Sequence, residues 1–214
     1  MFVPAQYRTP DSSWLVELLR RNPLALLLTN GRPGEVPYAT HLPVIFRQPP
    51  PAEPPPELSG TVLLGHLNRA NPHWRALSSS TDAVLVFTGP HAYVSPTVYR
   101  TEPAAPTWNY TAVHVHGRLQ KIGTAVETME VVKSTVRAYE DEFGAGWDMS
   151  GSIEYFEKLL PAVGAFRFVV SHTDGMFKLS QEQEPAVRER VVSAFMDRGS
   201  CPHRETAELM KRLA

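Results

Sequence analysis

The hydrophobic positions near the N-terminus follow helical spacing first and strand spacing afterwards. A cap at Asp11 or Ser12 and a stop at Asn22-Pro23 delimit a short predicted helix, whose apolar face carries Trp14, Leu15, Leu18 and Leu19. From residue 24 on, apolar residues form short runs or alternate with polar residues, as they do in β-strands. We expect strands over 24–29, 36–46, 61–67, 83–88, 91–95, 107–122, 165–171 and 176–179.

Turn residues divide these strands. Asn30–Gly34 is predicted to be a turn, and Asp174-Gly175 is the dipeptide that most favours a tight hairpin, here between the last two strands. Pro37 and Pro43 indicate that the strand over 36–46 is interrupted or lies at an edge. Between the second and third strands, residues 47–59 are predicted to form a solvated loop, with peptide recognition as the alternative, because they include Pro49, Pro50, Pro51, Pro54, Pro55 and Pro56.

Helical patterns occupy 124–142, 151–160 and a charged tail over 184–213, which 199–202 interrupts. No period of 20–50 residues repeats. Many strands with few long helices predict a mainly β (α+β) fold, an antiparallel closed barrel with peripheral helices. At 214 residues we expect one barrel domain over 1–195, followed by a C-terminal helical tail over 196–214.

The chain from 61 to 74 combines a strand with the start of a helix. Asn71 is a good N-cap, Pro72 suits the first helical position, and Arg69 lies two residues earlier. Free backbone N–H groups beside an arginine predict a phosphate site. The alternative is an ordinary strand-to-helix connection with a solvated arginine.

Composition narrows the possible functions. The net charge of −1 and the pI of about 6.7 give no basic footprint of the kind that nucleic-acid binders carry. Cys201 is the single cysteine, so no intrachain disulfide forms, which fits a reducing cytoplasm. No apolar run approaches the length of a membrane span, and no secretory signal is visible, so we expect a cytoplasmic protein without membrane attachment.

Common catalytic motifs are missing from the sequence. It contains no nucleophile elbow, no dinucleotide-binding glycine pattern and no Walker loop. His114 and His116 lie on the same face of their strand and could chelate a metal, but no Cys cluster or helical His-Glu-x-x-His accompanies them. We therefore expect no protein-bound metal, and expect these histidines to line a polar groove for a cofactor.

Six segments occur in order along the chain, namely Met1–Pro4, Ala39–Pro43, Gly65–Arg75, Phe87–Pro96, Pro106–His114 and Lys178–Gln181. Together they resemble one family over about residues 1–195, the PaiB-type FMN-binding split-barrel proteins, which are often described as negative transcriptional regulators. The resemblance implies a homodimer in which each FMN site is completed by the second subunit.

The resemblance also implies which residues hold FMN. Thr40 and His41 would contact the ring from the strand over 36–46, and Asn68, Arg69 and Asn71 would hold the phosphate. The second subunit would supply Trp108, Asn109 and His114. Residues near the ring or ribitol would be Lys178, Ser180 and Gln181. Heme is an alternative cofactor, because related barrels host heme and the chain has eight histidines.

Two segments depart from the family pattern. Residues 99–105 lack the lysines usual before the Pro-Thr-Trp-Asn-Tyr motif, and 182–190 replace the usual asparagine, Asp-Arg pair and glycine-containing segment. The loss of basic residues makes the rim of the FMN pocket less positive, which predicts weaker FMN binding or a different substrate.

The leading functional hypothesis is a flavin-dependent oxidoreductase, a reductase or monooxygenase acting on a small organic molecule. A PaiB-like transcriptional regulator that binds DNA is the first alternative, although the helix over 124–142 is acidic. A heme-binding protein or a flavin carrier without enzyme activity is the second. The substrate and the catalytic residues cannot be derived from this sequence.

Overall fold

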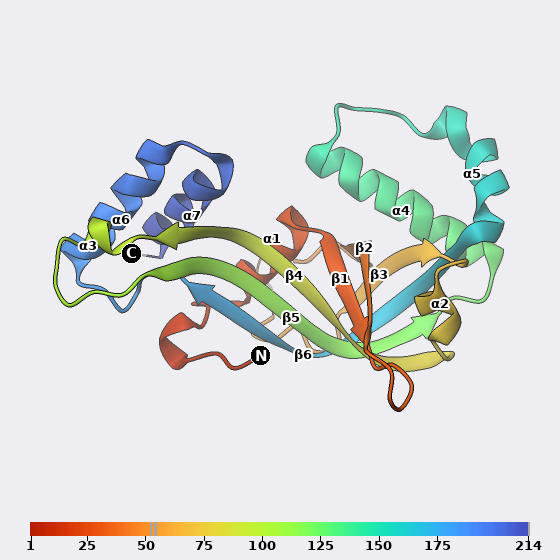
Figure 1. Ribbon diagram of the computed structural model, residues 1–214. Coiled ribbons are helices and arrows are strands. Elements are labelled where there is room, and N and C mark those ends of the chain that lie inside the picture. The colour runs from red at the N-terminus through yellow and green to blue at the C-terminus, as the bar shows by residue number, and fades with distance from the viewer. Residues whose placement is uncertain (52, 54, 214) are drawn as a thin grey trace.

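Six antiparallel strands form a closed barrel in the order β1-β2-β3-β6-β5-β4 (Figure 1). The structure is a computed structural model that describes residues 1–51, 53 and 55–213. The strands are β1 (Leu24–Thr29), β2 (Tyr38–Phe46), β3 (Val62–Asn68), β4 (Ser80–Val94), β5 (Thr107–Lys121) and β6 (Val163–Lys178). The predicted barrel with peripheral helices is confirmed, and it is the split-barrel architecture that the resemblance implies.

The alternation of side chains along each strand fills the barrel. Inward-facing Leu27, Leu85, Phe87, Phe166 and Phe168 are almost completely buried. Pairing of Leu26–Leu28 with Val84–Val86 closes the barrel between β1 and β4. Apolar residues at every second position therefore build the core, as expected for strands with one face inside a barrel.

The prediction of a hairpin at Asp174-Gly175 is wrong, because β6 runs without a break through both residues. Gly175 faces helix α1 (Ser12–Arg21), and a Cβ atom there would lie 2.5 Å from Leu15 Cδ2. The glycine therefore permits close packing of a helix on a strand, a role that the dipeptide alone does not distinguish from a turn.

Two other strand predictions change in detail. The runs over 83–88 and 91–95 are one strand, β4, whose register with β5 shifts between Thr88 and His91. β2 is not interrupted at Pro43. That proline pairs with Leu24 of β1, whereas the pairing of β2 with β3 begins at Val44, so Pro43 lies where β2 changes partners and its missing N–H costs little.

Helices cover the two ends of the barrel. Helix α4 (Ala125–Phe143) packs on β2, β3 and β6 and buries a separate apolar cluster made of Ile45, Leu64, Ile122, Val131 and Ala165. Shorter helices near it are α2 (Pro72–Ala76) and α5 (Ile153–Leu159), with 3-10 turns at Ser150–Ser152 and Leu160–Ala162. The opposite end carries α3 (Pro96–Tyr99), α6 (Pro185–Arg198) and α7 (Cys201–Arg212), and another 3-10 turn, Ala5–Tyr7, precedes α1 (Figure 1).

The predicted tail forms the antiparallel pair α6 and α7, joined at Gly199, which adopts a left-handed conformation. The predicted domain boundary at 195/196 falls within α6. Pro54 of the predicted proline-rich loop and Ala214 of the tail lie outside the described residues. Elsewhere in that loop Leu58 is buried, and the Pro55 carbonyl accepts a hydrogen bond from Ser12. Over the described chain, every helix is too short or too polar to cross a bilayer.

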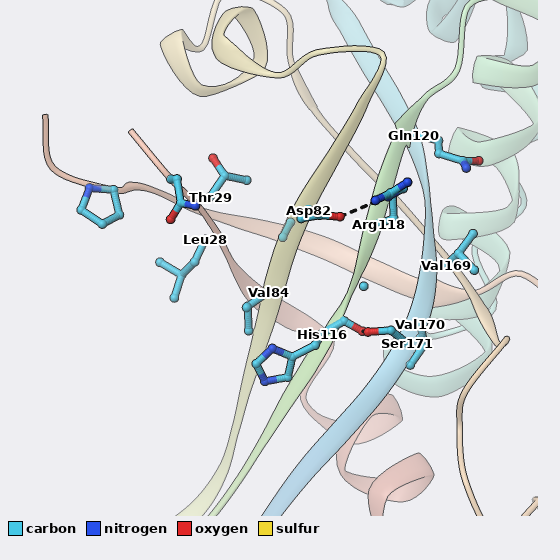
Figure 2. Close-up of a pocket in the computed structure, with 14 residues that line it drawn as sticks. Leu28, Thr29, Asp82, Val84, His116, Arg118, Gln120, Val169, Val170 and Ser171 are labelled. Carbon is cyan, nitrogen blue, oxygen red and sulfur yellow. Dashed lines mark hydrogen bonds and ion pairs between the residues drawn. The ribbon is translucent and has the colours of Figure 1, made fainter. Parts of the chain in front are cut away.

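The outer face of β1 and β4 is apolar. Leu24 is 64% exposed, and half-buried Leu26, Leu28, Val84 and Val86 lie on the same side of the sheet. A groove of about 800 Å³ continues this face onto β5 and β6 (Figure 2). Single exposed apolar side chains are common in monomers, but a contiguous apolar face of this kind indicates an interaction surface.

Candidate functional site

The connection from β3 to α2 folds as its sequence predicts. Asn71 caps α2, and its Oδ1 accepts a hydrogen bond from His73 N at 2.9 Å. Pro72 occupies the first turn of the helix. This local geometry brings Asn68, Arg69 and Asn71 together at one end of the barrel.

The backbone N–H groups expected to be free in this loop already have partners. Arg69 N donates to Ala162 O at 2.8 Å, Ala70 N donates to Asn68 Oδ1 at 2.7 Å, and Asn71 N donates to Asn68 O at 3.0 Å. The expectation of free backbone N–H groups is therefore wrong for residues 69–71, and the phosphate site at the start of α2 stays a prediction. The charged side chains beside the loop are further groups that could bind an anion.

Two cations lie beside this loop. Arg69 is exposed, and its Nε donates to Val163 O at 2.8 Å. Lys121, at the end of β5, donates from Nζ to Leu77 O at 2.6 Å and lies 4.6 Å from the centre of the Trp74 ring. Burial and the nearby charge of Arg69 both lower the pKa of Lys121. An anion between two such cations would relieve their repulsion.

Lys121 is a site residue that the sequence analysis missed. It follows a long regular strand and belongs to no motif, and only the fold brings it close to Arg69, which precedes it by 52 positions in the sequence.

Buried His73 links the loop to the barrel. Its Nδ1 lies 2.9 Å from Thr40 Oγ1 and its Nε2 lies 2.8 Å from Thr29 Oγ1, while its ring stacks on Tyr38. Burial lowers the pKa of His73, so the neutral ring is favoured. The Thr40 hydroxyl also accepts from Asn71 Nδ2 at 3.4 Å. Thr40 and Asn71 thus position the loop and lie at the predicted site at the same time.

A hollow of about 440 Å³ brings five of these polar side chains together, namely Thr40, His41, His66, Asn68 and Asn71. His66 Nδ1 is buried without a hydrogen-bond partner among the described residues. Burial also lowers the pKa of His66, so its neutral ring offers one donor and one acceptor. An orphaned polar atom at such a hollow fits a ligand with polar groups, such as the ring edge or ribitol of FMN.

Trp108 and Lys178 lie at the opposite end of the barrel. Trp108 is 53% exposed, and its ring centre lies 5.8 Å from that of Tyr93 and 6.0 Å from that of His91. Lys178 Nζ donates to Thr107 Oγ1 and, at 3.2 Å, to Trp108 O. This exposed aromatic group with an adjacent cation suits a planar, electron-poor or anionic ring.

Three other predicted site residues have partners within the chain. Asn109 and Ser180 are completely buried and hydrogen-bond each other at 2.9 Å, with Met210 of α7 packed on the Asn109 amide. Gln181 accepts from Leu179 N and donates to Phe177 O. These contacts secure the end of β6 against α7, and the cofactor-binding role predicted for these residues stays a prediction.

His114 lies midway along β5, and its side chain is half-buried on the outer face. Burial lowers the pKa of His114, and the neighbouring N-terminus and His116 lower it further. His114 thus lies apart from both ends of the barrel.

The two ends are too far apart to share one small ligand within a single chain. Trp108 and Lys121 lie on the same strand, thirteen positions apart, which corresponds to about 40 Å along the strand. Figure 1 shows β5 passing from the α6–α7 end to the α2 end. A cofactor that touches both groups requires residues from two chains.

The segments that depart from the family pattern lie near the Trp108 end. Arg190 of α6 donates from Nη2 to Tyr99 O and, at 3.3 Å, from Nε to Val98 O. Glu182 lies close enough to add to the effect of burial in raising the pKa of Tyr99. The segment over 182–190 thus contributes the carboxylate of Glu182 and an arginine, Arg190, whose guanidinium is already hydrogen-bonded to backbone carbonyls.

Comparison with known proteins identifies an FMN-binding domain in this chain. Residues 1–172 match the family model described as "Putative FMN-binding domain". The "Protease synthase and sporulation protein PAI 2" of Bacillus subtilis is 26% identical over 213 residues, 99% of this chain and 97% of that protein. An uncharacterized protein of Emericella nidulans is 29% identical over 233 residues, 94% of this chain and 92% of that protein.

Solved structures support the fold. The "FAD and Heme binding protein" of Mycobacterium smegmatis superposes with a TM-score of 0.58 at 16% identity, over 86% of this chain and 78% of that one. A conserved hypothetical protein of Mycobacterium tuberculosis gives a TM-score of 0.57 at 11% identity, over 86% and 94%. The family match covers most of the chain and agrees with the motifs in the sequence. The chain belongs to the FMN-binding domain family that includes the PaiB-type proteins.

Proposed function

We propose that this protein is an FMN-dependent oxidoreductase that acts on a small organic molecule and works as a homodimer. The observation that carries the proposal is the orphaned His66 Nδ1 at the hollow that Asn68 and Asn71 also line, in a chain of an FMN-binding family. Arg69, the residue after Asn68, lies close enough to Lys121 to lower its pKa.

The residues divide into two sets of contacts. Arg69 and Lys121 bind the phosphate through charge-assisted hydrogen bonds, and His41 and His66 contact the polar edge of the cofactor. Trp108 and Lys178 approach from the second subunit, because within one chain Trp108 and Lys121 lie about 40 Å apart along β5 and Lys178 lies at the Trp108 end. Bound FMN supplies the electron transfer, and the protein's side chains orient it and exclude water from one face.

The proposal is tested by titrating the cofactor-free protein with FMN and with riboflavin, which lacks the phosphate. We expect FMN to bind more tightly, and the bound flavin to be reduced anaerobically and reoxidised by oxygen or a small organic acceptor. Absence of flavin binding, or a bound flavin that resists reduction, would overturn the proposal. A strong Soret band in the purified protein would favour heme instead.

A further inference from the structure

A second cluster of functional side chains lies on the outer face of β5 and β6, away from the hollow beside Arg69. His116 Nε2 lies 3.2 Å from Asp174 Oδ2, and the ring of His172 stacks on that of His116 with 4.2 Å between centres. Ligand atoms of all three side chains lie within 4.8 Å of one another. We propose that His116, His172 and Asp174 bind a divalent transition-metal ion.

A β-bulge creates this cluster. Gly117 pairs with Val170, so regular pairing would set Ser171 opposite His116, but the register shifts and His172 takes that place. Directly opposite residues project to the same face, so His116 and His172 share the outer face with the next pair, His114 and Asp174. Bulges commonly redirect a side chain in this way next to functional sites.

A hydrogen bond favours the tautomer of His172 in which Nε2 is free to bind a metal. The Ser171 hydroxyl donates to the His116 carbonyl at 3.0 Å, so its oxygen accepts from His172 Nδ1 at 3.2 Å. The proton therefore sits on Nδ1, and His172 Nε2 keeps its lone pair. A ligand histidine whose other nitrogen is fixed by a hydrogen bond is the usual arrangement around protein-bound metals. Figure 2 shows His116 on β5 with Ser171 on the adjacent strand β6.

The distance between two of the three ligand atoms matches a small ion. Two ligand atoms at about 2.0–2.1 Å from a tetrahedral metal lie about 3.3 Å apart, close to the 3.2 Å between His116 Nε2 and Asp174 Oδ2. On binding, the His116 proton moves from Nε2 to Nδ1, and the ion replaces the hydrogen bond to Asp174. The exposed His172 ring turns about its Nδ1 hydrogen bond to Ser171, which takes it out of the stack and points Nε2 toward the ion.

Two imidazoles and one carboxylate are a donor set for zinc and for ferrous iron, and they leave room for water or another ligand. The N-terminal ammonium donates to Asp174 Oδ2 at 2.5 Å and competes with the ion for that oxygen. The sequence analysis considered His114 with His116, but the partner close enough is His172, which follows His116 by 56 positions in the sequence. The site makes no use of the flavin and does not depend on it.

The test is a calorimetric titration with Zn²⁺, using the full-length chain made without an affinity tag and first dialysed against a chelator. We expect one ion per chain. His172→Gln and Asp174→Asn should each weaken binding at least about tenfold, and Ser171→Ala, which keeps all three ligands, should weaken it about tenfold. His203→Gln is the control, because His203 lies on α7 near Cys201 and should leave the affinity unchanged. Circular dichroism verifies that each variant is folded.

Co²⁺ gives an independent readout. We expect visible bands of a cobalt site with nitrogen and oxygen ligands, and their loss in His172→Gln. A near-ultraviolet thiolate band, which Cys201→Ser removes, would place the metal on the tail and overturn the proposal. Zn²⁺ affinities that are equal in the native chain and in the folded His172→Gln and Asp174→Asn variants would also overturn it, as would the lack of any binding.

Discussion

Arg69 and Lys121 are held close together although both are positively charged. Lys121 is fixed by the Leu77 carbonyl and the Trp74 ring, and Arg69 is fixed by the Val163 carbonyl. Among the described residues, Arg69 makes no ion pair that would offset this repulsion. A bound anion would offset the repulsion between Arg69 and Lys121 and so stabilise this pair.

Arg69→Ala should therefore weaken FMN binding by about 2 kcal/mol, the typical loss of a charge-assisted hydrogen bond, and should leave riboflavin binding unchanged. Fluorescence titration with both ligands measures the difference. Arg75→Ala is the control, because Arg75 is an exposed arginine on the neighbouring helix. Equal losses for FMN and riboflavin would show that Arg69 does not contact the phosphate.

His66 and His73 predict a loss of stability in acid. Burial lowers the pKa of both below the unfolded value of about 6.5. The unfolded chain therefore takes up these protons first as the pH falls. Their contribution to stability is complete above about pH 6.5 and is lost below it, by at most about 1.4 kcal/mol per pH unit for each histidine.

Melting temperatures measured between pH 7.5 and 5.5 test this expectation. His66→Gln should make the decline with falling pH shallower, whereas His91→Gln, at an exposed position, should keep the native slope. Identical slopes in all three proteins would rule out His66 as a source of the acid sensitivity.

At the residue scale, the sequence predicts contacts that are local along the chain. Asn71 and its bond to His73 follow from positions two apart. The bond between Asn109 and Ser180, which are 71 positions apart, depends on how β5 and β6 pair with α7 against them. The sequence analysis missed Lys121 and His172 for the same reason, because their partners lie far away in the sequence.

At the scale of elements, periodicity predicts the strands well but not where a strand ends. The sequence predicts separate strands on either side of 88–91 and a turn at 174–175, yet both segments continue as strands with a bulge or a close helix contact. A dipeptide such as Asp-Gly allows the backbone to turn but does not require it, and tertiary packing decides whether the chain reverses there.

Gly164 illustrates how tightly α2 packs on the barrel. A Cβ atom at this position would lie 2.5–2.7 Å from three atoms of the Trp74 ring. Gly164→Ala should destabilise the protein by about 1–3 kcal/mol, the usual cost of overpacking, because the buried indole has little room to move. It should also weaken FMN binding, since Trp74 supports Lys121.

Chemical denaturation with tryptophan fluorescence measures the change in the free energy of unfolding. Gly123→Ala is the matched control, because a Cβ there would meet no atom within 4 Å, and it should change stability by less than about 0.5 kcal/mol. A Gly164→Ala variant as stable as the control would contradict the packing argument.

At the scale of the whole molecule, the apolar outer face of β1 and β4 predicts self-association. Light scattering at micromolar concentration should give the mass of two chains. Val84→Lys places a charge on this face without altering the core and should shift the mass to one chain. Val126→Lys, on the exposed side of α4, should remain dimeric. A monomeric native protein in the presence of FMN would refute the dimer.

The charge distribution predicts weak, sequence-independent DNA binding. Helix α4 carries five acidic residues and two basic ones, namely Glu127, Glu130, Glu140, Asp141 and Glu142 with Lys133 and Arg137. Such a helix repels phosphates. A gel shift with the DNA upstream of the protein's own gene measures this. A nanomolar, salt-resistant shift of one sequence would favour the transcriptional regulator instead.

The separation of about 40 Å along β5 between Trp108 and Lys121 also governs how the protein behaves on dilution. A flavin that bridges these residues across two chains is bound by the dimer and released by the monomer. By linkage, each flavin bound then tightens the association of the chains, and dilution of the protein empties the site. The apparent affinity for FMN should accordingly rise with protein concentration, so that the abundance of the protein determines how much of it carries its cofactor.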